Sequence, residues 1–336
     1  MNPARGGHGG AARARIAGLG WNLPERRLTN RDLETMVDTT DEWITTRTGI
    51  RERRIANNGT TAAQLAAPAA REALAEAGLA PSGLDMIIGA TLAPTRTFPS
   101  TACDLQQELG AARCAAFDVM AACSGFIYAS AVADSFIRTG AANNILVVAS
   151  EIVSPIINWK DRATCVLFGD GAAAAVYTAG DGSSGLLDSI LRSDGSFGDF
   201  LTGGGVGERE TFAEPRLDPG RFFLQMKGNQ TFKVAVKSMA EVAEEILARN
   251  GFTMDDVDLI VPHQANIRII QAVGKALGAP EEKVFVNVDR YGNTSAASIP
   301  IALYEARQQG RLTPGKLALL VAFGGGLTWG ASLIRW

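Results

Sequence analysis

The sequence predicts an α/β protein made of two similar halves, and two observations support this fold class. Segments with the same pattern recur half a chain apart. Glu76–Gly89 and Arg249–Pro262 both run from a helix end through a glycine to an aspartate and a buried strand. They start 173 positions apart (249 minus 76), and Val166–Gly171 similarly resembles Val321–Gly326. Short β-branched runs also alternate with helical patterns, which is typical of layered α/β folds.

The elements of the two halves can be placed in order. Strands predicted at Ala116–Val119 and Phe285–Val288 occupy matching positions, 169 residues apart (285 minus 116). Glycine just past the last residue is a helix-stop signal, and it recurs along the chain. The predicted helices are Thr61–Ala77, Ser100–Leu109, Ser124–Thr139, Gln230–Arg249, Ile267–Leu277 and Ser295–Gln309. Between them, the short apolar runs are predicted as buried strands.

This pattern divides the chain into four regions. Residues 1–15 form a tail of glycine, alanine and arginine that we expect to be disordered, although a transit peptide has a similar composition. Residues 16–180 form the first half. Residues 181–228 contain Gly203-Gly204-Gly205 and scattered prolines, which predict an inserted loop near the mouth of the site. Residues 229–336 form the second half.

Composition excludes several classes of function. The chain has 336 residues, 46% of them apolar, and a formal net charge of −3, so no global field attracts nucleic acid. No apolar run reaches the ~18 residues of a membrane span, and the tail lacks the apolar segment of a secretory signal. Four cysteines without CxxC spacing and two histidines make a metal site unexpected. So few cysteines in so long a chain fit a reducing cytoplasm.

Cys123 is the candidate nucleophile. It follows the predicted strand Phe117–Met120 and precedes a helix that begins near Ser124. The partial positive charge of a helix N-terminus favours the thiolate, and small neighbours leave room for a substrate. The alternative is a buried cysteine that acts only as a small apolar residue. That alternative is the interpretation we give to the other three cysteines.

His263 and Asn293 are the candidate partners of this thiol. His263 follows the strand Leu259–Pro262, and the only other histidine, His8, lies in the tail. An imidazole there can donate to a carbonyl or accept a proton, or it can be an ordinary interior histidine. Asn293 lies in a Gly-Asn-Thr-Ser segment that, by itself, is equally compatible with a turn or a helix cap. Because the two halves place Cys123 and Asn293 after matching strands, both are expected near the centre of the molecule.

The segment Gly324-Gly325-Gly326 follows the strand Leu319–Phe323. Glycine permits close approach of the backbone to a ligand, so an N–H group here is a candidate for an oxyanion hole. A hairpin turn is the alternative.

Taken together, these motifs resemble the β-ketoacyl-acyl carrier protein synthase III family, the initiating condensing enzymes of type II fatty acid synthesis within the thiolase superfamily. The resemblance extends from about Arg15 to Trp336. It rests on Asp41–Ile44, Arg47–Arg53, Ala121–Phe126, Val261–Asn266, Gly292–Ser298 and Phe323–Gly330. It implies a thiolase-like homodimer in which each chain forms five αβαβα layers.

The resemblance also implies a reaction. The Cys123 thiolate takes the acyl group of a short acyl-coenzyme A, and coenzyme A leaves. Malonyl-acyl carrier protein then loses CO2, and His263 and Asn293 stabilise the resulting enolate. The enolate attacks the acyl-cysteine, while the amides of Cys123 and Gly325 hold the tetrahedral oxyanion. No metal or redox cofactor is implied.

Further contacts are carried over from the family by motif. The expected coenzyme A contacts are Trp43 on the adenine, Arg162 on its other face or on phosphate, Arg47, Asn229 and Asn266. Phe98 is expected to reach into the acyl pocket of the partner chain, where its bulk favours a short primer. A basic patch for the acidic carrier protein is expected at Lys233, Lys237, Arg268 and Lys275. Packed aromatic, turn and solvated surface residues remain the alternatives for these positions.

Several other classes of protein use some of the same residues. Elongating ketoacyl synthases use two histidines and thiolases use a second cysteine, which this chain does not offer at matching positions. A specialised paralogue that makes a polyketide starter or a quinolone would keep all three residues, with divergence expected in Glu151–Arg162 and in 181–228. A papain-like hydrolase uses Cys, His and Asn in the same order, but in secreted, disulfide-linked proteins. A non-catalytic scaffold is disfavoured because the set is intact.

Overall fold

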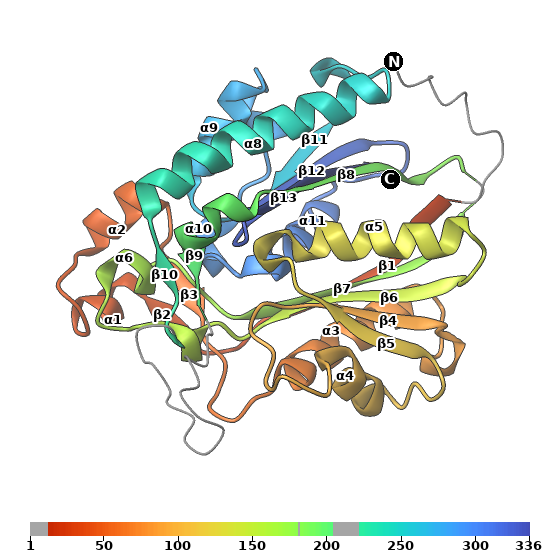
Figure 1. The fold of residues 1–336 in the computed structure, drawn as a ribbon, viewed down its shortest axis with the longest axis horizontal. Helices are drawn as coiled ribbons and strands as arrows, with labels where there is room; N and C mark the ends of the chain where they lie inside the picture. Colours follow the sequence, from red (N-terminus) through yellow and green to blue (C-terminus); the bar gives the residue numbers. More distant parts are fainter. Residues whose placement is uncertain (1–12, 181, 204–221) are drawn as a thin grey trace.

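The computed structural model of the protein describes residues 13–180, 182–203 and 222–336. Two sheets form its framework (Figure 1). The first has the order β1-β7-β6-β4-β5 and the second the order β11-β12-β13-β8. The strands of the first sheet are β1 (Arg13–Asn22), β4 (Met86–Ala90), β5 (Ala115–Val119), β6 (Asn144–Glu151) and β7 (Gly171–Gly180). Those of the second are β8 (Gly185–Ser193), β11 (Leu259–Pro262), β12 (Leu317–Gly324) and β13 (Thr328–Arg335).

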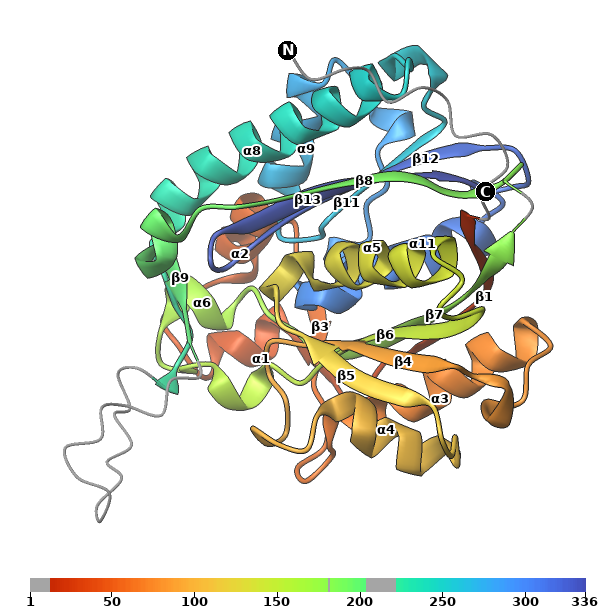
Figure 2. The same ribbon diagram turned by 45° about the vertical axis from the view of Figure 1, so that its right-hand side comes forward.

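Helices complete five layers, as the family resemblance implies. The outer face of the first sheet carries α3 (Ala62–Glu76) and α4 (Thr101–Leu109), and the outer side of the second carries α8 (Gly228–Arg249) and α9 (Ile267–Ala276). Between the sheets lie α5 (Gly125–Arg138) and α11 (Ser298–Gln308) (Figure 2). Because α5 and α11 contact both sheets, they are buried more completely than a surface helix. The αβαβα architecture implied by the family resemblance is therefore confirmed.

The predicted helices are confirmed to within a few residues, and the caps explain their ends. The Thr61 hydroxyl accepts from the Gln64 N–H at the start of α3, and the Gln64 Oε1 accepts from the Thr61 N–H. At the end of α4, Gly110 adopts φ = 67°, a left-handed conformation that glycine adopts at little cost. The predicted helix Ser295–Gln309 begins as a short 3-10 turn and becomes α11 only at Ser298.

The strand order shows the internal repeat directly. Reading inward from an edge, β1, β7, β6 and β4 correspond to β8, β13, β12 and β11. The counterpart of β5 is reduced to an isolated parallel bridge between Ile260 and Val284. The predicted strand Phe285–Val288 is therefore wrong, and Val288 instead begins the helix α10 (Val288–Tyr291). The apolar pattern at 285–288 resembles that of a strand, but among the described residues there, only Val284 pairs with a neighbouring strand.

The predicted inserted loop 181–228 is wrong for part of its length. Gly185–Ser193 forms β8, which pairs antiparallel with β13 and places Leu186 and Ile190 in the core. The second half therefore begins near residue 185 instead of 229. Residues 204–221, with Gly204, Gly205 and the two prolines, lie outside the described residues. The predicted tail also lies outside them through residue 12, together with His8, but its last residues, from Arg13 onward, belong to β1.

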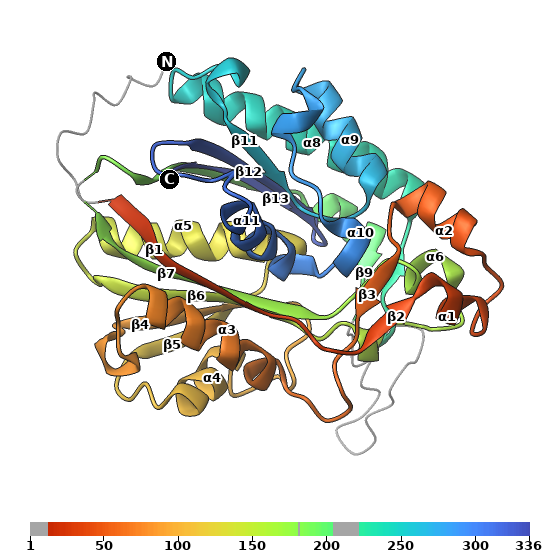
Figure 3. The same ribbon diagram turned by 180° about the vertical axis from the view of Figure 1, so that it is seen from behind.

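Smaller elements gather at one end of the layered body (Figure 3). They are β2 (Arg27–Thr29), β3 (Glu52–Arg54), β9 (Leu201–Thr202), β10 (Gln225–Met226), α1 (Asn30–Glu34), α2 (Asp41–Thr48) and α6 (Arg162–Cys165). Apolar side chains from these elements, among them Leu28, Ile44 and Cys165, belong to a separate cluster. Short 3-10 helices connect the main elements: η1 (Pro81–Gly83), η2 (Ala122–Ser124), η3 (Ser154–Ile156), η4 (Gly195–Phe200), η5 (Met254–Asp256), η6 (Glu281–Lys283) and η7 (Ser295–Ala297). Among the described helices, none combines the length and apolar character needed to cross a membrane.

Candidate active site

The structure brings the three predicted catalytic residues together. Cys123, His263 and Asn293 line one cavity of about 590 Å³. Each is buried: 4%, 3% and 6% of the residue surface, respectively, is exposed. They come from different parts of the chain, namely η2 before α5, the turn after β11, and the turn before η7. Only the packing of the two halves on each other places them in one cavity.

Cys123 lies at the junction that the sequence predicted. The turn before α5 requires φ = 44° at Ala122, an uncommon conformation for a residue other than glycine. Burial raises the pKa of the Cys123 thiol to about 12. The resting side chain is therefore a neutral thiol, and the thiolate predicted from the helix N-terminus is not the resting state. Burial removes water from the thiolate, and this raises the free energy of the thiolate by more than the helix N-terminus lowers it.

His263 is held by its neighbours in a neutral state. Its Nδ1 lies 2.7 Å from the Ser298 hydroxyl at the start of α11, and that hydroxyl accepts from the Gln264 N–H at 3.3 Å. Burial lowers the pKa of the imidazole to about 3. The Ser298 hydroxyl has one hydrogen to donate, and it can donate this hydrogen to an unprotonated Nδ1. In that tautomer, His263 presents Nε2–H as a donor.

Asn293 is fixed through both its backbone and its side chain. Its N–H donates to the Leu167 carbonyl at 2.8 Å, and its carbonyl accepts from the Gly169 N–H at 3.1 Å. Its Oδ1 accepts from the Ser295 N–H at 2.8 Å. The acceptor of the side chain is therefore engaged, and the amide nitrogen is its remaining donor group.

A buried arginine supports the segment that binds Asn293. The Arg53 side chain is fully buried and donates to the Val166 carbonyl at 2.7 Å and to Asn30 Oδ1 at 2.9 Å. Burial lowers its pKa to about 10. Gly292 adopts φ = 66°, and a Cβ there would lie 2.8 Å from the Leu167 carbonyl. The glycine and the arginine together bring Asn293 against Leu167.

The predicted glycine segment reaches the nucleophile. A Cβ on Gly324, the last residue of β12, would lie 2.6 Å from the Cys123 nitrogen. A Cβ on the next residue, Gly325, would lie 3.1 Å from the Leu201 carbonyl. Only glycine therefore allows β12 to end directly against the Cys123 backbone. The role of Gly325 as an oxyanion donor stays a prediction.

Trp43 also lines the cavity, and two cations lie close to its ring. The guanidinium carbons of Arg47 and Arg162 each lie 4.7 Å from its ring centroid. Arg162 also donates to the Asp38 carbonyl at 2.9 Å. Trp43 and Arg47 line the same cavity as Cys123, so an aromatic and cationic site is continuous with the thiol.

The family follows from comparisons with known proteins. Residues 117–195 match the family 3-oxoacyl-[acyl-carrier-protein (ACP)] synthase III, and residues 247–336 match its C-terminal domain. The chain is 53% identical to β-ketoacyl-[acyl-carrier-protein] synthase III of Roseiflexus castenholzii, over 96% of this chain and 98% of the relative. The crystal structure of 3-oxoacyl-[acyl-carrier-protein] synthase III from Aquifex aeolicus is 51% identical, with a TM-score of 0.90, over 96% of this chain and 100% of that one.

This chain belongs to the β-ketoacyl-[acyl-carrier-protein] synthase III family. It is thus a condensing acyltransferase of fatty acid synthesis, and the papain-like and scaffold alternatives are wrong. A priming β-ketosynthase of the R1128 polyketide pathway is also similar, with 35% identity and a TM-score of 0.89 over 98% of each chain. Fold and family are therefore shared by enzymes named for two kinds of product.

The remaining site residues predicted for this synthase III chain divide into two groups. Asn229 and Asn266 line the cavity, and Asn266 is also the N-cap of α9, where it accepts from the Ile269 N–H at 3.0 Å. Lys233 and Arg268 line it as well. Phe98 does not line this cavity, and 82% of its surface is exposed in the single chain.

Two cations of the predicted basic patch are separate from the cavity. Lys237 lies one turn beyond Lys233 on α8 and pairs with Glu241 at 3.8 Å. Lys275 lies on α9, at a second groove that also contains Glu281. Of the four predicted patch residues, only Lys233 and Arg268 therefore line the cavity, and both are exposed.

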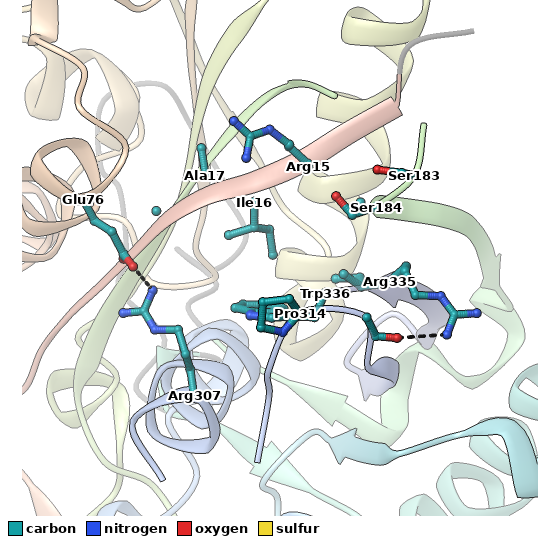
Figure 4. Close-up of a pocket in the computed structure, with 14 residues that line it drawn as sticks. Arg15, Ile16, Ala17, Glu76, Ser183, Ser184, Arg307, Pro314, Arg335 and Trp336 are labelled. Carbon is teal, nitrogen blue, oxygen red and sulfur yellow. Dashed lines mark hydrogen bonds and ion pairs between the residues drawn. The ribbon is translucent and has the colours of Figure 1, made fainter. Parts of the chain in front are cut away.

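Another cavity, of about 500 Å³, lies at the opposite edge near the C-terminus (Figure 4). It contains Arg15, Arg335 and an ion pair between Arg307 and Glu76. None of the predicted site residues lines it. Within the described residues, no group of three or more His, Cys, Asp or Glu side chains is arranged to hold a metal.

Sequence reasoning missed two polar residues beside the nucleophile. Glu151 ends β6 and is fully buried, and Ser295 in η7 is buried next to it. Burial raises the pKa of Glu151 to about 7, and the Glu151 charge contributes to the high pKa of Cys123. One signal was available: Glu151 is the only charged residue in the apolar strand Asn144–Glu151.

Proposed function

We propose that this synthase III chain condenses a short acyl-coenzyme A, most simply acetyl-coenzyme A, with malonyl-acyl carrier protein through an acyl-Cys123 intermediate. The products are 3-ketoacyl-acyl carrier protein, coenzyme A and CO2. One observation carries this proposal: Cys123, His263 and Asn293 line a single cavity that also contains Trp43 and Arg47. A nucleophile, two neutral donors and a nucleotide platform are the groups that such a reaction requires.

In the first half-reaction, the Cys123 sulfur attacks the thioester carbonyl of the acyl-coenzyme A. The carbon–sulfur bond to coenzyme A breaks, and the coenzyme A thiolate takes a proton from water. The N–H groups of Cys123 and Gly325 are proposed to hold the tetrahedral oxyanion. The close approach of β12 to the Cys123 backbone supports this arrangement.

In the second half-reaction, the malonyl carboxylate leaves as CO2 and its electron pair forms an enolate. His263 Nε2–H and the Asn293 amide are proposed to donate to the enolate oxygen. Both are neutral donors buried in the cavity, where preorganised hydrogen bonds stabilise developing negative charge effectively. The enolate carbon then attacks the acyl carbonyl and releases Cys123.

The chemistry of the cavity also supports the proposed partners. Trp43 would stack on the adenine, with Arg47 and Arg162 close enough to contact the ring or the phosphates. The exposed Lys233 and Arg268 would attract an acidic carrier protein. The exposed Phe98 would reach the acyl pocket of a partner chain in a homodimer.

The proposal is tested by incubating the protein with acyl-coenzyme A thioesters of increasing length and branching, and measuring its intact mass. Acetylation followed by malonyl-dependent release of a ketoacyl-carrier protein supports the assigned reaction. Labelling only by longer or branched groups would favour the second candidate, a specialised priming synthase. The similarity to the R1128 priming ketosynthase supports that candidate. Folded protein that no thioester labels would contradict both.

Replacing Trp43 with alanine should weaken coenzyme A binding specifically. Base–aromatic stacking contributes roughly 1–3 kcal/mol, so we expect the KM for acyl-coenzyme A to rise about tenfold with little change in kcat. Trp43→Phe, which keeps an aromatic face, should lose less. Steady-state kinetics with acyl-coenzyme A and with the matching acyl-pantetheine distinguish the causes, because the shorter thioester has no adenine. An equal loss with both substrates would remove Trp43 from adenine binding.

A further inference from the structure

One buried carboxyl group beside the nucleophile has no part in the proposed reaction. Glu151 lies at the carboxyl end of β6, and none of its surface is exposed. Its carboxylate accepts from the Thr91 hydroxyl at 2.9 Å, from the Leu92 N–H at 3.1 Å and from the Ala296 N–H at 3.3 Å. These donors fix the carboxylate at the level where η7 packs against both the end of β6 and η2.

The Ser295 hydroxyl lies near both this carboxylate and the thiol. It is buried and has no hydrogen bond of normal geometry with any described residue. The same hydroxyl is nevertheless close enough to lower the pKa of both the Cys123 thiol and the Glu151 carboxyl. Burying a hydroxyl without a hydrogen-bond partner destabilises the fold. A functional role of Ser295 near the two titratable groups would explain why a hydroxyl occupies this position.

The backbone of Ser295 has an uncommon conformation at this position. Ser295 has φ = 51°, a left-handed conformation in which serine is uncommon. Ala122, its counterpart in the first half, has φ = 44° and precedes Cys123. The two residues are 173 positions apart (295 minus 122), as are Ser298 and Gly125 at the starts of α11 and α5 (298 minus 125). The two turns of the repeat therefore face each other, one with the thiol and the other with the hydroxyl.

The thiol needs a group that takes its proton, and His263 is unsuited to this. Its Nδ1 is paired with Ser298, and burial lowers the pKa of the ring to about 3. In the tautomer that suits enolate stabilisation, Nε2 already carries a hydrogen. The Glu151 carboxyl, by contrast, has a pKa that burial raises to about 7, so its carboxylate can accept a proton near neutral pH.

We propose that Ser295 and Glu151 form a proton relay for Cys123. As the bond between sulfur and the acyl carbon forms, Ser295 accepts the thiol proton and passes its own hydroxyl proton to the Glu151 carboxylate. When condensation breaks that bond, the sulfur leaves as a thiolate and Glu151 returns the proton through Ser295. The proton that coenzyme A gains comes from water, so charge and protons balance over the cycle.

The relay rests on the proposed acyl-Cys123 reaction, and it predicts a pH dependence. The accepting form of Glu151 is the carboxylate, which increases as the pH rises through about 7. The groups that act on it in the described chain are the hydroxyls of Ser295 and Thr91 and the N–H groups of Leu92 and Ala296, and Cys123 is the titratable group facing it. The acylation rate should therefore rise with pH, with a midpoint near 7.

The experiment measures the single-turnover rate of Cys123 acylation by rapid quench and intact mass, from about pH 5.5 to 9. Wild-type protein should show the midpoint near 7. In Glu151→Gln and in Ser295→Ala, we expect that transition to disappear and the rate at pH 8 to fall at least tenfold. Glu151→Asp should retain a transition and recover part of the rate. Coenzyme A binding measured by calorimetry confirms that each variant is folded.

Asp170→Asn is the matched control. Asp170 is also a buried carboxyl with a raised pKa, but it accepts from the Ala56 and Val153 N–H groups and from Ser154. Its replacement should leave the midpoint near 7. If Glu151→Gln and Ser295→Ala are acylated with the wild-type midpoint, at whatever rate, the relay is wrong. If wild-type protein is not acylated at any pH, the proposed function fails instead.

Discussion

Cys123→Ala is expected to abolish acylation by every acyl-coenzyme A thioester that labels the wild-type protein. The thiol is the sole group at this position that can form the thioester, and alanine fills nearly the same buried space. The measurement is the intact mass after incubation, which should show the acyl increment in the wild type and none in the variant. Overall condensation should fall by several orders of magnitude for the same reason.

A second cysteine provides the control for this experiment. Cys103 lies on α4 and is half-buried, and its thiol lies 3.5 Å from the Ala116 carbonyl. Cys103→Ala should be acylated at the wild-type rate. Persistent acylation of Cys123→Ala would instead mean that another nucleophile carries the acyl group. Malonyl decarboxylation, which the proposed mechanism assigns to His263 and Asn293 and not to the thiol, should continue in Cys123→Ala.

Asn293→Ala is expected to separate the two half-reactions. Removing one preorganised donor to an oxyanion typically costs a factor of about 10²–10³ in rate, so malonyl decarboxylation and condensation should fall by about that amount. Acylation of Cys123 should change only a few-fold, because the thioester oxyanion is assigned to backbone N–H groups. The two rates are measured as CO2 release and as the single-turnover mass increment.

A second variant guards against a structural explanation. Asn293 Oδ1 accepts from the Ser295 N–H, so alanine also removes a bond that shapes η7. Asn293→Asp keeps that acceptor but puts a carboxyl oxygen in place of the amide donor, and we expect it to lose decarboxylation as well. An equal fall of acylation and decarboxylation in both variants, with an unchanged melting temperature, would refute the role assigned to Asn293.

The protonation state of the Cys123 thiol is the largest difference between what the sequence suggested and what the structure shows. The strand–helix junction before α5 was predicted, and the partial positive charge of a helix N-terminus favours the thiolate. The structure buries Cys123 so completely that its thiol is neutral, with a pKa of about 12. A helix terminus acts within one turn, whereas desolvation depends on everything that packs around the group. The helix terminus can be predicted from the local sequence, whereas the desolvation of Cys123 cannot.

The sequence by itself determined the layered α/β class, the internal repeat, the main helices and the three site residues. These follow from short-range patterns: apolar period, glycine after a helix, and polar residues placed after buried strands. These patterns did not indicate β8, because its segment lies in the same stretch, 181–228, as glycine- and proline-containing residues. They also predicted a strand at Phe285–Val288 that the structure does not contain.

Only the tertiary structure decided how the two halves face each other. It placed Ala122 and Ser295 in opposed turns, brought Gly324 against the Cys123 backbone and set Glu151 beside the thiol. Each of these relations joins residues far apart in the sequence. They depend on packing and on the electrostatics of buried groups, which act through space, and so no local pattern along the chain records them.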